Sequence, residues 1–137
     1  MDDPLETDVL IIGCGIAGGT AALQLAEAGC HVTLVTRTTE PGDSNTYYAQ
    51  GGIIYRGADD SPALLAEEIS RAGAGHCNPK AVSILAEEGP TLVREILVDK
   101  VGVPFDRNGG GQLSLTREGG HSIPRIIHAA DFTGRAI

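Results

Sequence analysis

The sequence has little positive charge, no long apolar run and no recognisable leader. Its 10 Lys and Arg residues are outnumbered by 18 Asp and Glu residues, which leaves a net charge of −8. Nonspecific nucleic-acid binding needs a basic face, so this charge argues against it. The longest apolar stretches are far too short to span a bilayer. The first residues, MDDPLETD, are acidic and apolar-poor, unlike a signal or transit peptide. We expect a cytoplasmic protein that binds neither nucleic acid nor membrane.

Disulfide and metal signatures are missing as well. Cys14, Cys30 and Cys77 are odd in number and show no CxxC spacing, so reduced thiols are the simplest interpretation. No HExxH motif, P-loop or cluster of metal-ligating residues appears along the chain. The sequence therefore predicts no metal site.

The sequence does contain enough apolar residues to form a core, and it contains many glycines. Apolar residues make up 42% of the 137 positions, and glycine occupies 19 of them. The apolar run at 8–12 is typical of a strand covered on both faces. Residues 19–29 have helical spacing and stop at Gly29, a plausible C-cap. Residues 31–35 are rich in β-branched side chains and predict a second strand. Together these segments predict a βαβ unit over about residues 8–36.

The turn between the first strand and the helix carries a glycine pattern. Residues 13–18 read GCGIAG, which matches G-x-G-x-x-G between a predicted strand and a predicted helix. The first glycine makes the turn, the second admits a pyrophosphate to the backbone, and the third lets helix and strand pack closely. We expect a dinucleotide site formed by Gly13, Cys14, Gly15, Ile16, Ala17 and Gly18.

The identity of the dinucleotide stays open at this point. The acidic residue that usually binds the ribose hydroxyls should end the second strand, where this chain has Thr36 followed by Arg37. A neutral hydroxyl beside an arginine is compatible with the 2′-phosphate of NADP. The alternative is that Arg37 is a solvated loop cation.

Two helix starts are predicted downstream. Ser61 and Asn78 are each followed by proline, a pair typical of an N-cap and the first helical position. The helical segment extends over residues 61–98. Gly89-Pro90 should divide its second part into two helices at an angle, because proline cannot continue the hydrogen-bond ladder.

Two shorter features follow the helices. Asn108-Gly109 lies between short extended runs and predicts a hairpin within residues 103–122. Asp131 or Thr133 could cap a further helix, but only four residues follow Thr133. We therefore expect the chain to be a fragment of a longer protein.

Four segments together resemble one known family. These are GCGIAG, SNTYYAQGGI at 44–53, LTREGGHS at 115–122 and RIIHAADFTG at 125–134. In this order they resemble the flavoprotein family of aspartate oxidases, fumarate reductases and succinate dehydrogenases, over roughly the first quarter of the family's length. The resemblance implies an α/β fold: a Rossmann-like FAD-binding domain with a parallel sheet, incomplete at its C-terminal end. The family's capping and helical domains would lie beyond residue 137.

The resemblance also implies a role for the segment at 44–53, which in that family passes along the isoalloxazine ring of FAD. The flavin-contacting residues would be Ser44, Asn45, Thr46, Tyr47, Tyr48, Ala49, Gln50, Gly51 and Gly52, with Thr36 and Arg37 also at the cofactor. Some of these residues could instead form turns, and the two tyrosines could pack a core edge. Succinate dehydrogenases and many fumarate reductases have, at the position of Asn45, a histidine that bonds to FAD. Asparagine implies noncovalent FAD.

Glu118 is the residue that the resemblance connects with the substrate. In aspartate oxidases this glutamate orients the substrate's α-amino group, and an ammonium does need an anionic partner. The alternative is a surface acid at the end of a hairpin. Carboxylate binding is also open, with less support, for Arg117, His121, Arg125 and His128. We expect His31 and His76 to be structural.

The implied activity is oxidation of L-aspartate to iminoaspartate, the first step of de novo NAD biosynthesis. FAD would accept the hydride, O2 or fumarate would reoxidise the flavin, and the family suggests partnership with quinolinate synthase. The 137-residue chain alone is expected to be inactive. The alternatives are a soluble fumarate reductase or succinate dehydrogenase-like flavoprotein, and a nonenzymatic FAD- or NADP-binding module.

Overall fold

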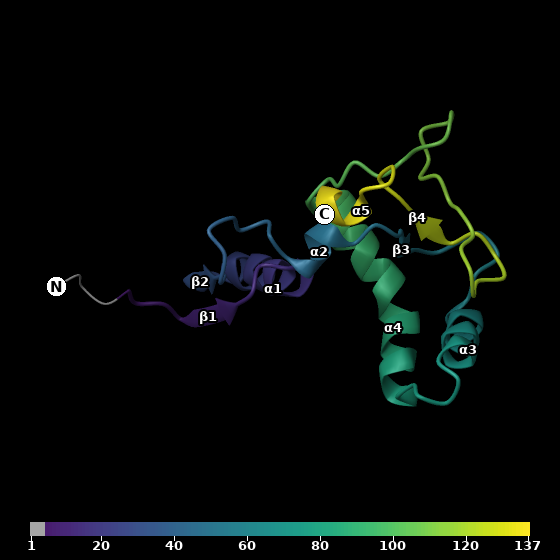
Figure 1. The fold of residues 1–137 in the computed structure, drawn as a ribbon, viewed down its shortest axis with the longest axis horizontal. Coiled ribbons are helices and arrows are strands. Elements are labelled where there is room, and N and C mark those ends of the chain that lie inside the picture. Colours follow the sequence, from purple (N-terminus) through teal and green to yellow (C-terminus); the bar gives the residue numbers. More distant parts are fainter. Residues whose placement is uncertain (1–4) are drawn as a thin grey trace. The chain divides into compact units, whose positions relative to one another are not determined.

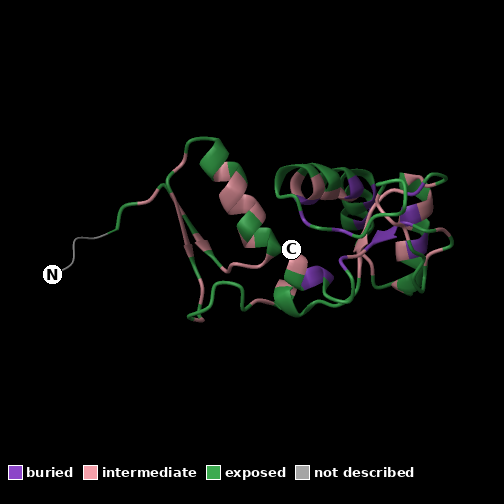
Figure 2. Cartoon of the chain, turned by 90° about the horizontal axis from the view of Figure 1, so that it is seen from above, coloured by how far each residue is buried: buried purple, intermediate pink, exposed green. Residues whose placement is uncertain are grey.

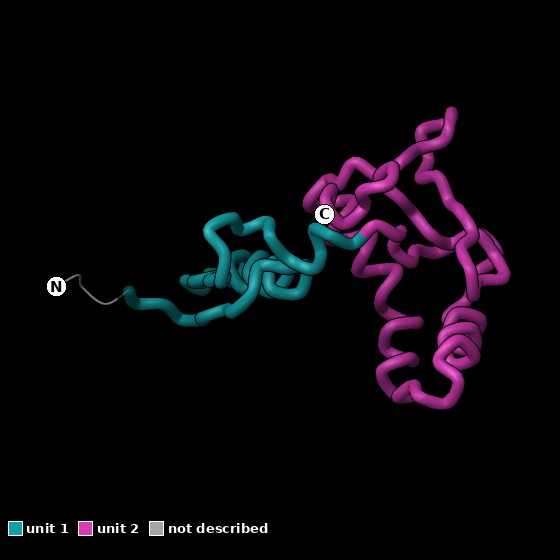
Figure 3. Tube along the Cα trace, in the orientation of Figure 1, with its two compact units in different colours: residues 1–49, 137 teal, residues 50–136 magenta. Residues whose placement is uncertain are grey.

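A computed structural model describes residues 5–137. The chain divides into two compact units (Figures 1 and 3). The first consists of the residues up to 49 together with residue 137, and the second consists of residues 50–136.

The first unit contains a βαβ motif. β1 (Val9–Ile12) and β2 (Val32–Val35) are parallel, and α1 (Ile16–Glu27) connects them. These bounds confirm the two strands and the helix expected between residues 8 and 36. The short helix α2 (Asn45–Tyr48) lies further along the same unit.

The glycine after α1 ends the helix as expected. Gly29 has φ +84°, a backbone conformation that suits glycine. Its N–H donates to Ala26 O at 3.0 Å, and the next N–H, that of Cys30, donates to Leu25 O at 3.0 Å. These two bonds form a Schellman motif around the C-cap residue Ala28. The local sequence therefore determines where α1 stops.

Only one face of β1 is covered. Val9 and Ile11 are half-buried, whereas Leu10 and Ile12 are exposed, Ile12 by 83%. No residue between 5 and 49 is buried, and Figure 2 shows the buried residues in the second unit. Among residues 5–49 the second face has no cover, so cover on both faces stays a prediction for a longer protein. The reason is that α1 alone covers the two-stranded sheet in the first unit.

The second unit begins with a strand and two capped helices. β3 (Ile53–Ile54) pairs antiparallel with β4 (Ile126–Ile127). The helices α3 (Pro62–Ala72) and α4 (Pro79–Leu92) start where the sequence predicted. The Ser61 hydroxyl accepts from Leu64 N–H at 3.1 Å, and the Asn78 side chain accepts from Lys80 N–H at 3.0 Å. Both N-caps are confirmed.

The predicted division at Gly89-Pro90 is wrong. Helix α4 continues through Pro90 and is followed directly by η1 (Val93–Lys100), which has the wider π-helical winding. Proline has no N–H for the carbonyl of Ala86, four residues earlier. That carbonyl instead accepts from Arg56 Nη2 at 3.0 Å. A side chain from outside the helix thus replaces the missing donor.

The rest of the second unit forms a turn, the core and a last helix. Asn108 N–H donates to Gln112 O at 2.8 Å, which confirms the turn, but only an isolated bridge joins Arg107 to Leu113. Thr133 begins α5 (Thr133–Ala136), and its hydroxyl accepts from Ala129 N–H. The buried apolar side chains are Leu65, Val82, Ala86, Leu97, Val103, Phe105, Ile126, Ile127 and Ala129. The chain is an α/β structure with a two-stranded parallel sheet.

Candidate functional site

The glycine fingerprint has the backbone geometry that its pattern predicts. Gly13 has φ +111°, and its N–H donates to Val35 O at 2.8 Å, which joins the turn to the end of β2. A Cβ at Gly18 would lie 1.9 Å from Gly13 O, so the third glycine is needed for the close approach of helix and turn. Gly15 is the N-cap of α1 and offers no side-chain cap. The first turn of α1 contains no acidic residue, so its N–H groups favour an anion.

The segment after residue 43 is tied to that helix start. Ser44 caps α2 by accepting from Tyr47 N–H at 3.3 Å. Thr46 Oγ1 accepts from Ile16 N–H at 2.9 Å, across 30 residues of sequence. A Cβ at Gly15 would lie 3.2 Å from the same Thr46 oxygen. The Thr46 hydroxyl thus satisfies one free amide of α1, a contact that the sequence did not predict.

These elements of the first unit surround one cleft. Its volume of about 730 Å³ is within the usual range of small-molecule sites. The turn after β1, the end of β2 and the start of the 44–53 segment all contribute to its walls. The lining residues are Ile12, Gly13, Cys14, Gly15, Val35, Thr36, Arg37, Asp43, Ser44, Asn45, Thr46 and Tyr48.

The cleft also includes an acid that the sequence analysis missed. Asp43 lines it and accepts from the Tyr48 hydroxyl at 2.9 Å. This hydrogen bond, and then the charge of Asp43, raise the pKa of Tyr48 above its ordinary value. The rings of Tyr47 and Tyr48 meet edge to face at 5.2 Å, and Tyr48 is 66% exposed. The alternative that they pack a core edge is wrong, because the described part of the first unit has no buried residue.

In the second unit, Glu118 lies beside the glycine pair at 51–52. Its Oε1 accepts from Gly52 N–H at 3.4 Å, although the two residues are 66 positions apart. The same oxygen lies 3.2 Å from His128 Nε2. The Glu118 side chain is 43% exposed, so the carboxylate can still reach a ligand. A Cβ at Gly52 would lie 2.7 Å from the backbone oxygen of Ile127 and 2.7 Å from His128 Cε1, which explains why glycine is required there.

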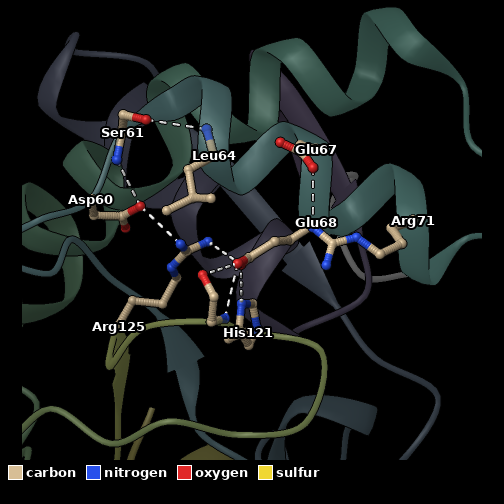
Figure 4. Close-up of polar contacts among 9 residues, drawn as sticks. Asp60, Ser61, Leu64, Glu67, Glu68, Arg71, His121 and Arg125 are labelled. Carbon is tan, nitrogen blue, oxygen red and sulfur yellow. Dashed lines mark hydrogen bonds and ion pairs between the residues drawn. The ribbon is translucent and has the colours of Figure 1, made fainter.

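Arg125 is a structural residue in the second unit. Its side chain is fully buried, and its guanidinium lies 3.0 Å from Asp60 Oδ1 and 3.0 Å from Glu68 Oε2 (Figure 4). Both carboxylates are buried too. His121 Nδ1 lies 3.4 Å from Glu68 Oε2. Carboxylate binding by Arg125, which the sequence left open, is wrong because two internal carboxylates already hold this cation.

Glu68 connects this cluster to the segment that carries Glu118. Both the hydroxyl and the N–H of Ser122 donate to Glu68 Oε1. The Ser122 hydroxyl is the main reason why the pKa of Glu68 lies below its ordinary value; burial opposes the shift, and the Ser122 N–H, Arg125 and His121 support it. Nothing in the local sequence pattern marks Glu68 or Asp60 as members of a buried cluster.

The remaining predicted residues are less informative. Arg117, His31 and His76 are exposed, and the backbone N–H of His31 donates to Asp8 Oδ2 at 2.7 Å. The three cysteines are not joined in disulfides. Among residues 5–137, no group of three or more His, Cys, Asp or Glu side chains could hold a metal ion. Over the same residues, no helix combines the length and apolarity needed to cross a membrane.

Comparison with known proteins decides the family. The profile described as "FAD binding domain" matches residues 8–137. The chain belongs to this FAD binding domain family. FAD is therefore the cofactor, which decides the question that Thr36 and Arg37 left open. The cleft, the glycine turn and the acid-free first turn of α1 suit the pyrophosphate of such a dinucleotide.

Sequence relatives of this FAD-binding chain include enzymes named L-aspartate oxidase. That of Halobacterium salinarum is 42% identical over 137 residues, which is 100% of this chain and 26% of the relative. The chloroplastic L-aspartate oxidase of Arabidopsis thaliana is 43% identical over 131 residues, which is 95% of this chain and 20% of the relative. The chain thus spans about a fifth to a quarter of the length of the curated relatives it matches.

Solved structures of similar fold include two bacterial proteins at about 30% identity. A quinol fumarate reductase of E. coli superimposes with a TM-score of 0.86 at 29% identity, over 96% of this chain and 23% of that chain. The Sdh1 complex of Mycobacterium smegmatis gives a TM-score of 0.85 at 32% identity, over 95% of this chain and 22% of that chain. The α/β fold of the FAD-binding chain is therefore similar to that of these flavoproteins.

Proposed function

We propose that the chain is the N-terminal part of an FAD-dependent L-aspartate oxidase, referred to below as the full-length protein. This enzyme oxidises L-aspartate to iminoaspartate, the first step of de novo NAD biosynthesis. The exposed carboxylate of Glu118 beside Gly52 is the observation that carries the proposal. The level of identity to enzymes named L-aspartate oxidase, along the whole chain, supports the same conclusion.

The cofactor site is proposed to use three groups of residues. The backbone from Gly13 to Gly18 binds the pyrophosphate, and Thr36 and Arg37 lie at the ribose. Residues 44–52 contact the flavin. When bound, FAD supplies the hydride acceptor, and O2 or fumarate reoxidises it. Asn45 has no imidazole nucleophile, so the flavin is held noncovalently.

Glu118 is proposed to select the substrate by its charge. L-Aspartate has an ammonium on the carbon that is oxidised, and an anionic carboxylate pairs with it through a charge-assisted hydrogen bond. Fumarate and succinate have no ammonium, so they gain nothing from this carboxylate. The chain's residues therefore orient the amino group and leave the redox chemistry to the cofactor.

The wider architecture is part of the proposal. Residues 1–137 belong to a larger Rossmann-like FAD-binding domain whose parallel sheet includes β1 and β2. The exposed apolar side chains of Leu10 and Ile12 favour further structure over that face of the sheet. Capping and helical domains follow in the full-length protein, which we place in the cytoplasm, with quinolinate synthase as a partner.

A Glu118→Gln variant of the full-length protein tests the function. Loss of a charge-assisted contact costs about 1.5–3 kcal/mol, so kcat/KM for L-aspartate should fall by about 10- to 150-fold. Fumarate reduction by the reduced enzyme should change by less than about threefold, because no ammonium is bound. Glu88→Gln, an exposed change on α4, is the matched control and should leave both activities unchanged.

Three results would contradict the proposal. A full-length protein that reduces fumarate but does not oxidise L-aspartate would favour the fumarate reductase alternative. The chain's fold is compatible with that alternative, since it is similar to the fold of the E. coli enzyme. Equal losses of both activities in Glu118→Gln would remove the role assigned to the carboxylate. Bound flavin without either activity would favour a nonenzymatic binding module.

A further inference from the structure

His128 contacts the carboxylate of Glu118 and is less exposed than that residue. Its Nε2 lies 3.2 Å from Glu118 Oε1, the oxygen that also accepts from Gly52 N–H. The His128 side chain is only 22% exposed, about half the value for Glu118. Both protein contacts therefore fall on one oxygen, and within residues 5–137 no hydrogen bond to Oε2 is formed.

The imidazole itself is held in place by its neighbours. Thr116 Oγ1 lies 2.7 Å from His128 Nε2, and the same hydroxyl lies 3.4 Å from Ile126 O. Because the hydroxyl proton can bind the Ile126 carbonyl, its oxygen is free to accept the Nε2 proton. Thr116 N–H also donates to Ile126 O at 2.9 Å, which anchors the backbone of Thr116 next to β4. The ring packs against Gly52, where no Cβ would fit.

We propose that His128 is a positioning residue that sets specificity for an amino-dicarboxylate. Its Nε2 proton is shared between Thr116 Oγ1 and Glu118 Oε1, and this fixes the rotamer of the glutamate. The carboxylate then presents Oε2 to the substrate ammonium at little cost in side-chain entropy. A glutamate on an exposed segment would otherwise sample several rotamers. This inference rests on the proposed function, because it assigns the amine of L-aspartate to Oε2.

Two substitutions separate positioning from a general structural role. In the full-length protein, His128→Leu removes the donor and keeps an apolar side chain of similar bulk. His128→Gln retains a side-chain N–H near the position of Nε2. We expect KM for L-aspartate to rise by about fivefold or more in His128→Leu and by less than about twofold in His128→Gln. KM for fumarate should stay within about twofold in both variants, since it has no amine.

The controls distinguish the possible failures. Wild-type turnover of L-aspartate tests the proposed function by itself; if it is absent, that function is overturned before any variant is compared. His76→Leu makes the same substitution at an exposed histidine of the same unit and should change neither KM. If His128→Leu does not fold, Thr116→Val removes the oxygen that holds Nε2, and it should raise KM for L-aspartate while sparing fumarate.

A measurement independent of turnover uses the ¹⁵N resonance of the His128 ring. Glu118→Gln should shift the Nε2 signal, whereas Glu88→Gln should not. The inference is overturned if the Nε2 signal does not respond to Glu118→Gln. It is also overturned if His128→Leu raises the KM for L-aspartate and for fumarate equally, or if His128→Gln is as impaired as His128→Leu.

Discussion

Replacement of Arg125 by methionine should destabilise the second unit more than any change at its surface. The guanidinium is fully buried and lies 3.0 Å from Asp60 Oδ1 and 3.0 Å from Glu68 Oε2. Methionine occupies a broadly similar space without charge. Two buried carboxylates would then share the site without the cation that now lies between them (Figure 4).

The size of the effect follows from the burial. Removing one partner of a buried ion pair costs about 3–5 kcal/mol, because the remaining charge is left without compensation. His121, 3.4 Å from Glu68, offsets part of this cost only when it is protonated. Since 1.4 kcal/mol is a factor of ten, amides that exchange through opening of this unit should exchange about 150- to 5,000-fold faster.

Hydrogen exchange of the full-length protein, followed by mass spectrometry, measures this faster amide exchange directly in peptides that cover α3. Arg71→Met is the matched control, because Arg71 and Glu67 form an ion pair at 3.3 Å with side chains 65% and 71% exposed. Such a surface pair contributes about 0–1 kcal/mol, so exchange should change less than about fivefold. Adding Glu68→Gln to Arg125→Met should restore part of the protection. Equal exchange in Arg125→Met and Arg71→Met would refute the reasoning.

Three further predictions concern the acid stability, the glycine turn and the flavin. Ser122→Ala removes the hydrogen bond that lowers the pKa of Glu68. The stabilisation from that bond is present above the ordinary pKa of glutamate, and it is lost as the pH falls through the lowered pKa of Glu68. The variant should therefore unfold at a higher pH in an acid titration followed by circular dichroism, whereas Ser70→Ala should match wild type. Gly18→Ala places a Cβ 1.9 Å from the backbone oxygen of Gly13, so it should weaken FAD binding by about 1–3 kcal/mol in a fluorescence titration. Gly19→Ala adds its Cβ in open space and should bind FAD normally. Acid precipitation of the full-length protein should release all yellow chromophore to the supernatant, because Asn45 cannot bond covalently to flavin; colour that stays in the washed pellet would contradict noncovalent binding.

The sequence alone determined the features that depend on near neighbours. The fingerprint at 13–18, the end of α1 at Gly29 and the N-caps Ser61 and Asn78 all lie where the pattern predicted. The helix end and the two N-caps rest on hydrogen bonds within about five residues, so the residue types in a short window carry the information. Motif order also pointed to FAD, in agreement with the family match.

Tertiary structure decided what depends on residues far apart in the chain. Helix α4 continues through Pro90 because Arg56, from another segment, donates to the carbonyl of Ala86. Arg125 became a buried structural cation because α3 and its N-terminal flank bring two carboxylates to it. Glu118 meets Gly52 across 66 positions of sequence. No local periodicity encodes such meetings, since they follow from how strands and helices pack once each has formed.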